Sequence, residues 1–88
     1  VLRLKFALNK NRMSQLETII NEILDDSGRA PISSLSAEMR LREDLGLSSL
    51  ELAVLTVRLE AVYGIDVFAS GLVTTVGEVL AKLPPQAN

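Results

Sequence analysis

The sequence predicts an all-α fold, and three observations lead to that prediction. Apolar residues make up 48% of the 88-residue chain and are mostly Leu, Ile, Val and Ala, with only three aromatic residues. In several segments they recur at the three- and four-residue spacing of a helix. Three segments begin with Ser or Thr followed three residues later by Glu, the capping-box pattern of helix starts. The length fits one domain with one modest core.

The first twelve residues differ from the rest of the chain. Apolar residues alternate there with basic ones, a period of two for which the sequence offers no partner strand. We interpret residues 1–12 as a leader, either disordered or a remnant of cloning or of upstream translation, with a native start at Met13. A genuine extra strand and a basic surface anchor are the alternatives.

A first helix is predicted to begin at Ser14, which forms a capping box with Glu17. The helix should end near Asp26, before Gly28, because glycine readily adopts the positive φ of a helix end. One apolar stripe is expected to face the core, comprising Leu16, Ile19, Ile20, Ile23 and Leu24.

Residues 29–48 show no sustained period and predict a long connection. One helical turn is expected near residues 36–40. Spaced apolar residues should hold the connection on the core, namely Ile32, Leu35, Met39, Leu41, Leu45 and Leu47.

A second helix is predicted over residues 49–63, with Ser48 as N-cap, a capping box to Glu51, and Gly64 at its end. Its apolar residues are too many for one core-facing stripe. The helix is therefore either central and nearly surrounded, or it presents an exposed apolar patch for binding.

The C-terminal part predicts a turn or brief helix around residues 68–72 and a last helix that starts near Thr74 or Thr75. Thr75 and Glu78 form the third capping box, and Pro84-Pro85 stops the helix, since proline lacks a donor and clashes with the preceding turn. Residues 84–88 are expected to be a tail. The apolar face of the last helix comprises Val76, Val79, Leu80 and Leu83.

The net charge of −2 conceals an asymmetry. Residues 1–12 carry four basic side chains and no acid, whereas the remainder carries five basic and eleven acidic side chains, a net −6. Such a body disfavours nucleic acid and anionic membranes and favours partners with basic patches. No apolar run reaches the roughly 18 residues that span a bilayer. Without Cys, thiolate metal sites and disulfides are excluded, which fits a reducing cytoplasm. We expect a monomer that holds no metal.

Ser49 stands out at the start of the most apolar helix. A serine hydroxyl is a weak nucleophile unless a neighbouring base takes its proton, and the chain contains neither His nor Cys. A displayed serine in this setting is better explained as a handle that other proteins modify. The sequence therefore indicates a carrier and not an enzyme.

Three segments, in order and spacing, make the chain resemble the acyl carrier proteins from about residue 14 to residue 83. The segment 41–51, LREDLGLSSLE, looks like the family's D-L-G-x-D-S-L attachment motif. The segment 59–64, LEAVYG, is similar to the family's end of the second helix, and 73–76, VTTV, is similar to its threonine start of the last helix.

The resemblance implies a four-helix bundle of acyl-carrier type, with a long first loop and a short third helix, over residues 13–83. It also implies that a phosphopantetheinyl transferase, using coenzyme A and magnesium, attaches 4′-phosphopantetheine to Ser49. The terminal thiol of that arm would carry acyl groups as thioesters between loading and processing enzymes of a fatty-acid, polyketide or lipid pathway. Because the thiol belongs to the cofactor, the protein needs no catalytic residue.

Several positions depart from the family pattern. Ser48 stands where Asp usually precedes the modified serine, and Val54 and Ala61 stand where fatty-acid carriers often show acids. We therefore expect a specialised carrier rather than the housekeeping fatty-acid carrier. Expected partner-binding residues are Glu51, Leu50, Val57, Glu60 and Asp44.

Other classes stay open at this stage. The cargo of a carrier is chosen by its loading enzyme, so an aminoacyl or peptidyl carrier is an alternative. An interaction module that keeps the carrier fold without modification is another. For Leu50 and Val57 a place in the core is an equally good explanation.

Overall fold

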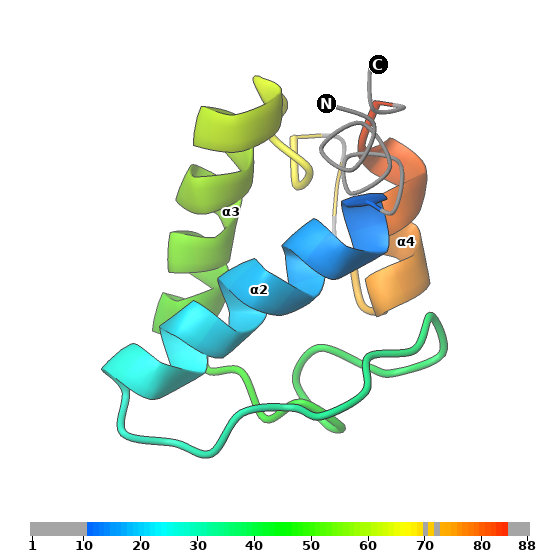
Figure 1. Cartoon of the computed structure of the whole chain (residues 1–88). Coiled ribbons are helices and arrows are strands. Elements are labelled where there is room, and N and C mark those ends of the chain that lie inside the picture. The colour runs from blue at the N-terminus through cyan, green and yellow to red at the C-terminus, as the bar shows by residue number, and fades with distance from the viewer. Residues whose placement is uncertain (1–10, 70, 72, 85–88) are drawn as a thin grey trace, which may run out of the picture.

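The computed structural model describes residues 11–69, 71 and 73–84, and over these residues the chain is all-α, as predicted (Figure 1). No described residue lies in a β-strand; an isolated antiparallel bridge joins Arg40 and Thr75. None of the helices in the described part is long and apolar enough to cross a membrane. The helices are α2 (Asn11–Asp26), α3 (Ser49–Tyr63) and α4 (Val76–Lys82).

Helix α2 buries the apolar stripe that its sequence predicts. Each of the five predicted residues of that stripe is at most 7% exposed. The helix ends at Asp26, and Gly28 adopts a φ of +75° directly after it. In Figure 1 the end of α2 lies beside the beginning of α3, and α2 crosses α3 obliquely.

The predicted start of α2 is wrong. The helix begins at Asn11, so Ser14 lies inside it and cannot be its N-cap. The added turn contacts the end of α4, where Arg12 Nη1 donates to the backbone oxygens of Leu83 at 3.1 Å and Leu80 at 3.5 Å. The expected leader thus overlaps α2 at residues 11 and 12, while residues 1–10 lie outside the described part, as do residues 85–88 of the expected tail.

Helix α3 has the predicted bounds and both predicted caps. The Ser48–Glu51 capping box is present, and Gly64 ends the helix with a φ of +72°. Only a narrow stripe faces the core, with Leu55 and Leu59 both fully buried. The opposite side remains apolar and exposed, so the second of the two expected arrangements is correct. We call this surface the apolar face of α3; its large members are Leu50, Val54 and Val57, whereas the exposed Val62 faces α2.

The long connection between α2 and α3 is held on the core as predicted. Leu35, Leu41, Leu45 and Leu47 are buried, and Ile32 and Met39 pack against the core. A hydrogen-bonded turn lies in the expected range, where the Met39 N–H donates to the Ser36 oxygen at 3.2 Å. A second turn follows, in which the backbone N–H groups of Asp44 and Leu45 both donate to the Arg40 oxygen at 3.0 Å.

The connection also pairs with the start of α4. The Leu41 N–H donates to the Thr74 oxygen at 2.8 Å, and the Val76 N–H donates to the Met39 oxygen at 2.9 Å. A third backbone bond, 2.9 Å long, joins the Gly77 N–H to the Ala37 oxygen. The segment before α3 and the start of α4 are therefore fixed to each other.

Helix α4 begins at the predicted capping box of Thr75 and Glu78, and it buries Val76 and Val79. The short helix expected around residues 68–72 is only partly described, because Ser70 and Leu72 lie outside the described residues. The described neighbours form turns, in which the N–H groups of Ala69 and Gly71 donate to the oxygens of Asp66 and Phe68. Val67, in the same segment, is fully buried.

Candidate functional site at the start of helix α3

Two adjacent serines at the start of α3 have different roles. Ser48 is the N-cap: its hydroxyl accepts a hydrogen bond from the Glu51 N–H at 3.1 Å, and its own N–H donates to the Glu51 carboxylate at 2.8 Å. Ser49 is the first residue of the helix and is exposed. The capping geometry thus uses the hydroxyl of Ser48 and displays that of Ser49.

The hydroxyl of Ser49 contacts a cation. Nη1 of Arg42 donates to Oγ of Ser49 at 3.0 Å. A guanidinium stays protonated at any physiological pH, so it cannot take the serine proton. The group that contacts Ser49 is therefore a donor, which does not turn the serine into a nucleophile.

Glu51 is the buried centre of a polar network behind the serines, with 7% of the residue exposed. Besides the N–H of Ser48, its carboxylate accepts from Ser27 Oγ at 2.7 Å and from Arg29 Nη1 at 2.6 Å. These donors lower the pKa of Glu51 from 4.5 to about 2, the Ser48 backbone N–H contributing most. Glu51 was expected to bind partners, but its charge is used inside the molecule, so we omit it from the partner surface proposed below.

Arg29 links this network to the loop before the serines. Its Nη2 donates to the backbone oxygens of Gly46 at 2.8 Å and Leu45 at 3.1 Å, while its Nη1 contacts Glu51. Gly46 permits this approach, because it has a φ of +73° and a Cβ at that position would lie 2.6 Å from Arg29 Nη2. Arg29 therefore ties the end of α2, the loop and the start of α3 together.

Substituting Gly46 by alanine is expected to lower the free energy of unfolding by about 2 kcal/mol. Left-handed backbone strain in a non-glycine residue costs roughly 1 kcal/mol or more, and the guanidinium of Arg29 must also move away. Urea denaturation at neutral pH measures the loss.

The matched control for Gly46→Ala is Gly28→Ala. Gly28 has nearly the same φ, +75°, but a Cβ there would meet no atom within 4 Å. The loss in free energy of unfolding for Gly28→Ala should therefore reflect the left-handed backbone strain alone. Equal losses for the two variants would show that the contact between Gly46 and Arg29 contributes nothing to stability.

A shallow groove of about 270 Å³ adjoins Ser49. Arg42 and Ser49 form its polar end, and its other lining residues are Leu52, Ala53, Thr56 and Phe68. An arginine beside the hydroxyl and a mostly apolar surface beyond it fit a phosphate followed by a thin, weakly polar chain. The residues present therefore fit the phosphopantetheine that the resemblance implies.

Three of the other expected partner-binding residues lie on α3 after Ser49, and Asp44 lies in the connection before it. Leu50 is 74% and Val57 65% exposed, which excludes the core role considered for them. Glu60 is exposed near the far end of the helix. Asp44 is exposed and pairs with Arg40, whose guanidinium and backbone N–H lower the pKa of Asp44.

Sequence reasoning missed Arg42, Arg29 and Ser27. Arg29 and Ser27 lie 22 and 24 residues before the Glu51 that they contact, so no local pattern connects them to it. Arg42 lies within the recognised motif, seven residues before Ser49. A basic residue inside the motif of the displayed serine was the one signal that could have drawn attention to it.

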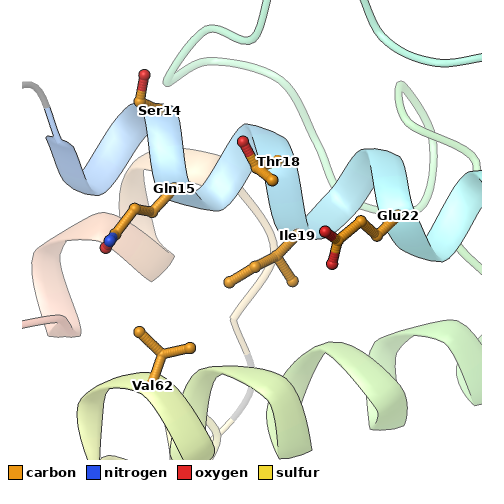
Figure 2. A pocket seen from close by; sticks show the side chains of 6 residues that line it. All are labelled: Ser14, Gln15, Thr18, Ile19, Glu22 and Val62. Atoms are coloured by element: carbon orange, nitrogen blue, oxygen red, sulfur yellow. The ribbon is translucent and has the colours of Figure 1, made fainter. Parts of the chain in front are cut away.

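A second hollow, of about 290 Å³, lies between α2 and the far end of α3. In Figure 2, Gln15, Ile19 and Glu22 of α2 lie across from Val62 of α3. Val62 follows Ser49 by almost four helical turns, about 20 Å along the axis. This hollow is therefore separate from the site around Ser49.

Comparison with known proteins agrees with this geometry. The family model described as phosphopantetheine attachment site matches residues 14–83. Among solved structures, the chain is similar to the solution structure of MacpD, an acyl carrier protein from Pseudomonas fluorescens involved in mupirocin biosynthesis. The identity is 35% and the TM-score 0.62, over 84% of this chain and 73% of that chain. Curated protein sequences gave no significant match.

Proposed function

Since the chain belongs to the phosphopantetheine-binding carrier proteins, a non-catalytic family, we propose that Ser49 is the residue that carries its arm. On this proposal a phosphopantetheinyl transferase joins the phosphorus of the arm to Oγ of Ser49. The pyrophosphate bond of coenzyme A breaks, adenosine 3′,5′-bisphosphate leaves, and the transferase accepts the hydroxyl proton. When bound, the arm supplies the thiol that holds cargo as a thioester. The protein itself displays the serine, orients the attached phosphate and offers a surface to successive enzymes.

The observation that carries this assignment is the contrast between Ser48 and Ser49. The capping box uses the hydroxyl of Ser48, whereas the hydroxyl of Ser49 is exposed and contacts only the guanidinium of Arg42 within the described residues. A phosphate on Ser49 would also meet the N–H groups that the first turn of a helix leaves unpaired. Modification of Ser49 thus leaves the cap of α3 intact.

We propose that the enzymes served by the arm dock around Ser49 on the apolar face of α3. Leu50 and Val57 would provide apolar contacts, and Glu60 and Asp44 would provide charges at its edges. The predominance of apolar side chains on this face predicts that partners bind it through apolar contact more than through basic patches.

We further propose a specialised pathway, with a polyketide cargo as the first candidate. The support is the 35% identity to MacpD, which is described as acting in mupirocin biosynthesis. Ser48 in place of the usual Asp fits the same proposal, since it removes a charge next to the modified residue. An amino-acid cargo is the alternative, and the cytoplasm, where coenzyme A is available, is the proposed location.

Incubation with coenzyme A, magnesium and a promiscuous transferase is expected to add one phosphopantetheine to the protein. Intact-mass measurement should show this gain in the wild type and none in Ser49→Ala. The matched control is Ser48→Ala, which loses the N-cap of α3 at a cost of about 1 kcal/mol but retains the modified residue. It should still gain the arm. A gain in Ser49→Ala, or no gain in the folded wild type, would contradict the assignment.

A further inference from the structure

The arginines of the described residues have different partners. Arg29, Arg40 and Arg58 form ion pairs with acidic side chains. Arg12 donates to the backbone oxygens at the end of α4. Arg42 differs from all of these, because the hydroxyl of Ser49 is its contact within the described residues and no carboxylate there neutralises it.

The backbone next to Arg42 is held in place. Leu41 and Leu45, on either side, are 1% and 4% exposed. The Leu41 N–H donates to the Thr74 oxygen, and the Leu41 oxygen accepts from the Leu47 N–H at 3.0 Å. The side chain of Arg42 is exposed, but it extends from a fixed position.

The acids near Arg42 in the sequence form no ion pair with it. Its direct neighbour Glu43 is exposed and is not paired with Arg42 within the described residues. Asp44 pairs with Arg40 through both the guanidinium and the backbone N–H. Glu51 is occupied by Ser48, Ser27 and Arg29. Asp44 and Glu51 are thus engaged by other residues. The guanidinium of Arg42 has N–H donors beyond the one that contacts Ser49.

We propose that Arg42 is a positioning residue that binds the phosphate of the attached arm. This inference rests on the proposed attachment at Ser49. Esterification bonds phosphorus to the same Oγ that Arg42 contacts at 3.0 Å, so the charged phosphate oxygens arrive next to its guanidinium. A guanidinium binds phosphate oxygens through two parallel hydrogen bonds more strongly than it binds a neutral hydroxyl.

Binding of the phosphate would set the direction in which the arm leaves the protein. Arg42 and Ser49 lie at the same end of the groove beside α3. A phosphate held there starts the arm at the mouth of that groove, whereas a free phosphate could rotate about the serine side chain. Arg42 would therefore reduce the number of directions that the arm explores before a partner binds.

The test is ³¹P NMR of the loaded protein during a titration with NaCl. In the wild type the phosphodiester resonance should shift as salt screens the exposed ion pair. In Arg42→Gln the resonance should start at a different position and move several-fold less. Arg42→Lys, which keeps the charge but loses the planar fork, should give an intermediate response.

The matched control is Arg58→Gln, which removes the same charge from an arginine of α3 that is paired with Glu22 and Asp26, so no acid near Arg42 is released. It should reproduce the wild-type titration. Identical titrations for wild type and Arg42→Gln would overturn the role of Arg42, while the mass gain at Ser49 would still support the carrier function. Failure of the wild type to gain the arm would overturn the proposed attachment and this inference together.

Discussion

Replacing Glu51 by alanine is expected to lower the free energy of unfolding by about 3 kcal/mol. The carboxylate accepts from the Ser48 N–H, from Ser27 and from Arg29, and the substitution leaves all three donors without it. Unpaired donors that are partly buried cost about 1–3 kcal/mol, and the lost ion pair with Arg29, whose side chain is 37% exposed, adds less than a fully buried pair would. A domain of this size has few kcal/mol to lose, so Tm should fall by more than about 10 °C.

Glu60→Ala is the matched control for this substitution. Glu60 lies on the same helix but is exposed, so its removal should change the free energy of unfolding by less than about 0.5 kcal/mol. Urea denaturation of both variants at pH 7 makes the comparison. A loss below 1 kcal/mol for Glu51→Ala would mean that the network around Glu51 contributes little to the fold.

The contribution of Glu51 should also depend on pH in a defined direction. The pKa of Glu51 is about 2 in the folded protein, below its ordinary value of 4.5, so folding favours the ionised carboxylate. Its stabilisation is fully present above pH 4.5 and is lost as the pH falls towards 2. The difference in unfolding free energy between wild type and Glu51→Gln should therefore be constant at pH 6–8 and shrink in acid. A constant difference down to pH 2.5 would contradict the lowered pKa.

Truncation of Leu55 to alanine is expected to cost about 3–4 kcal/mol. Leu55 is fully buried in the narrow stripe that α3 presents to the core. A Leu-to-Ala change in such a position loses the transfer free energy of the side chain and leaves a cavity that the neighbours fill only in part. The measurement is chemical denaturation, with far-UV circular dichroism to confirm that the variant is helical.

Val57→Ala is the matched control, because it truncates an apolar side chain of the same helix that is exposed instead of buried. Val57 lies two residues later on the same helix but is 65% exposed. Alanine is a better helix former than valine by a few tenths of a kcal/mol, so this variant should be as stable as the wild type or slightly more stable. Similar losses for Leu55→Ala and Val57→Ala would show that the apolar face of α3 is covered in the free protein.

The elements that the sequence predicted well are those defined by short-range interactions. The capping boxes at Ser48 and Thr75 each join residues three positions apart, and both helix starts are where the pattern places them. The ends of α2 and α3 likewise follow from Gly28 and Gly64, which adopt positive φ. Such signals depend on neighbours in the chain and are therefore visible without the fold.

The features that the sequence could not predict depend on distant residues. The first turn of α2, which the sequence pattern missed, contacts residues about 70 positions later through Arg12. The side of α3 that faces the core could not be chosen either, because apolar residues occur on every side of that helix. Within the site, the exposure of Ser49 agrees with its predicted role, whereas the burial of Glu51 required knowledge of Ser27 and Arg29. The attachment at Ser49 itself stays a prediction until the mass is measured.

The pairing of the long connection with the start of α4 has a consequence for local unfolding. Amides in an irregular loop usually exchange with solvent through small, independent openings. Here the amides of Leu41, Val76 and Gly77 close bonds between the two segments, so detachment of one segment requires detachment of the other. The loop before Ser49 and the first turn of α4 thus form a single cooperative opening unit.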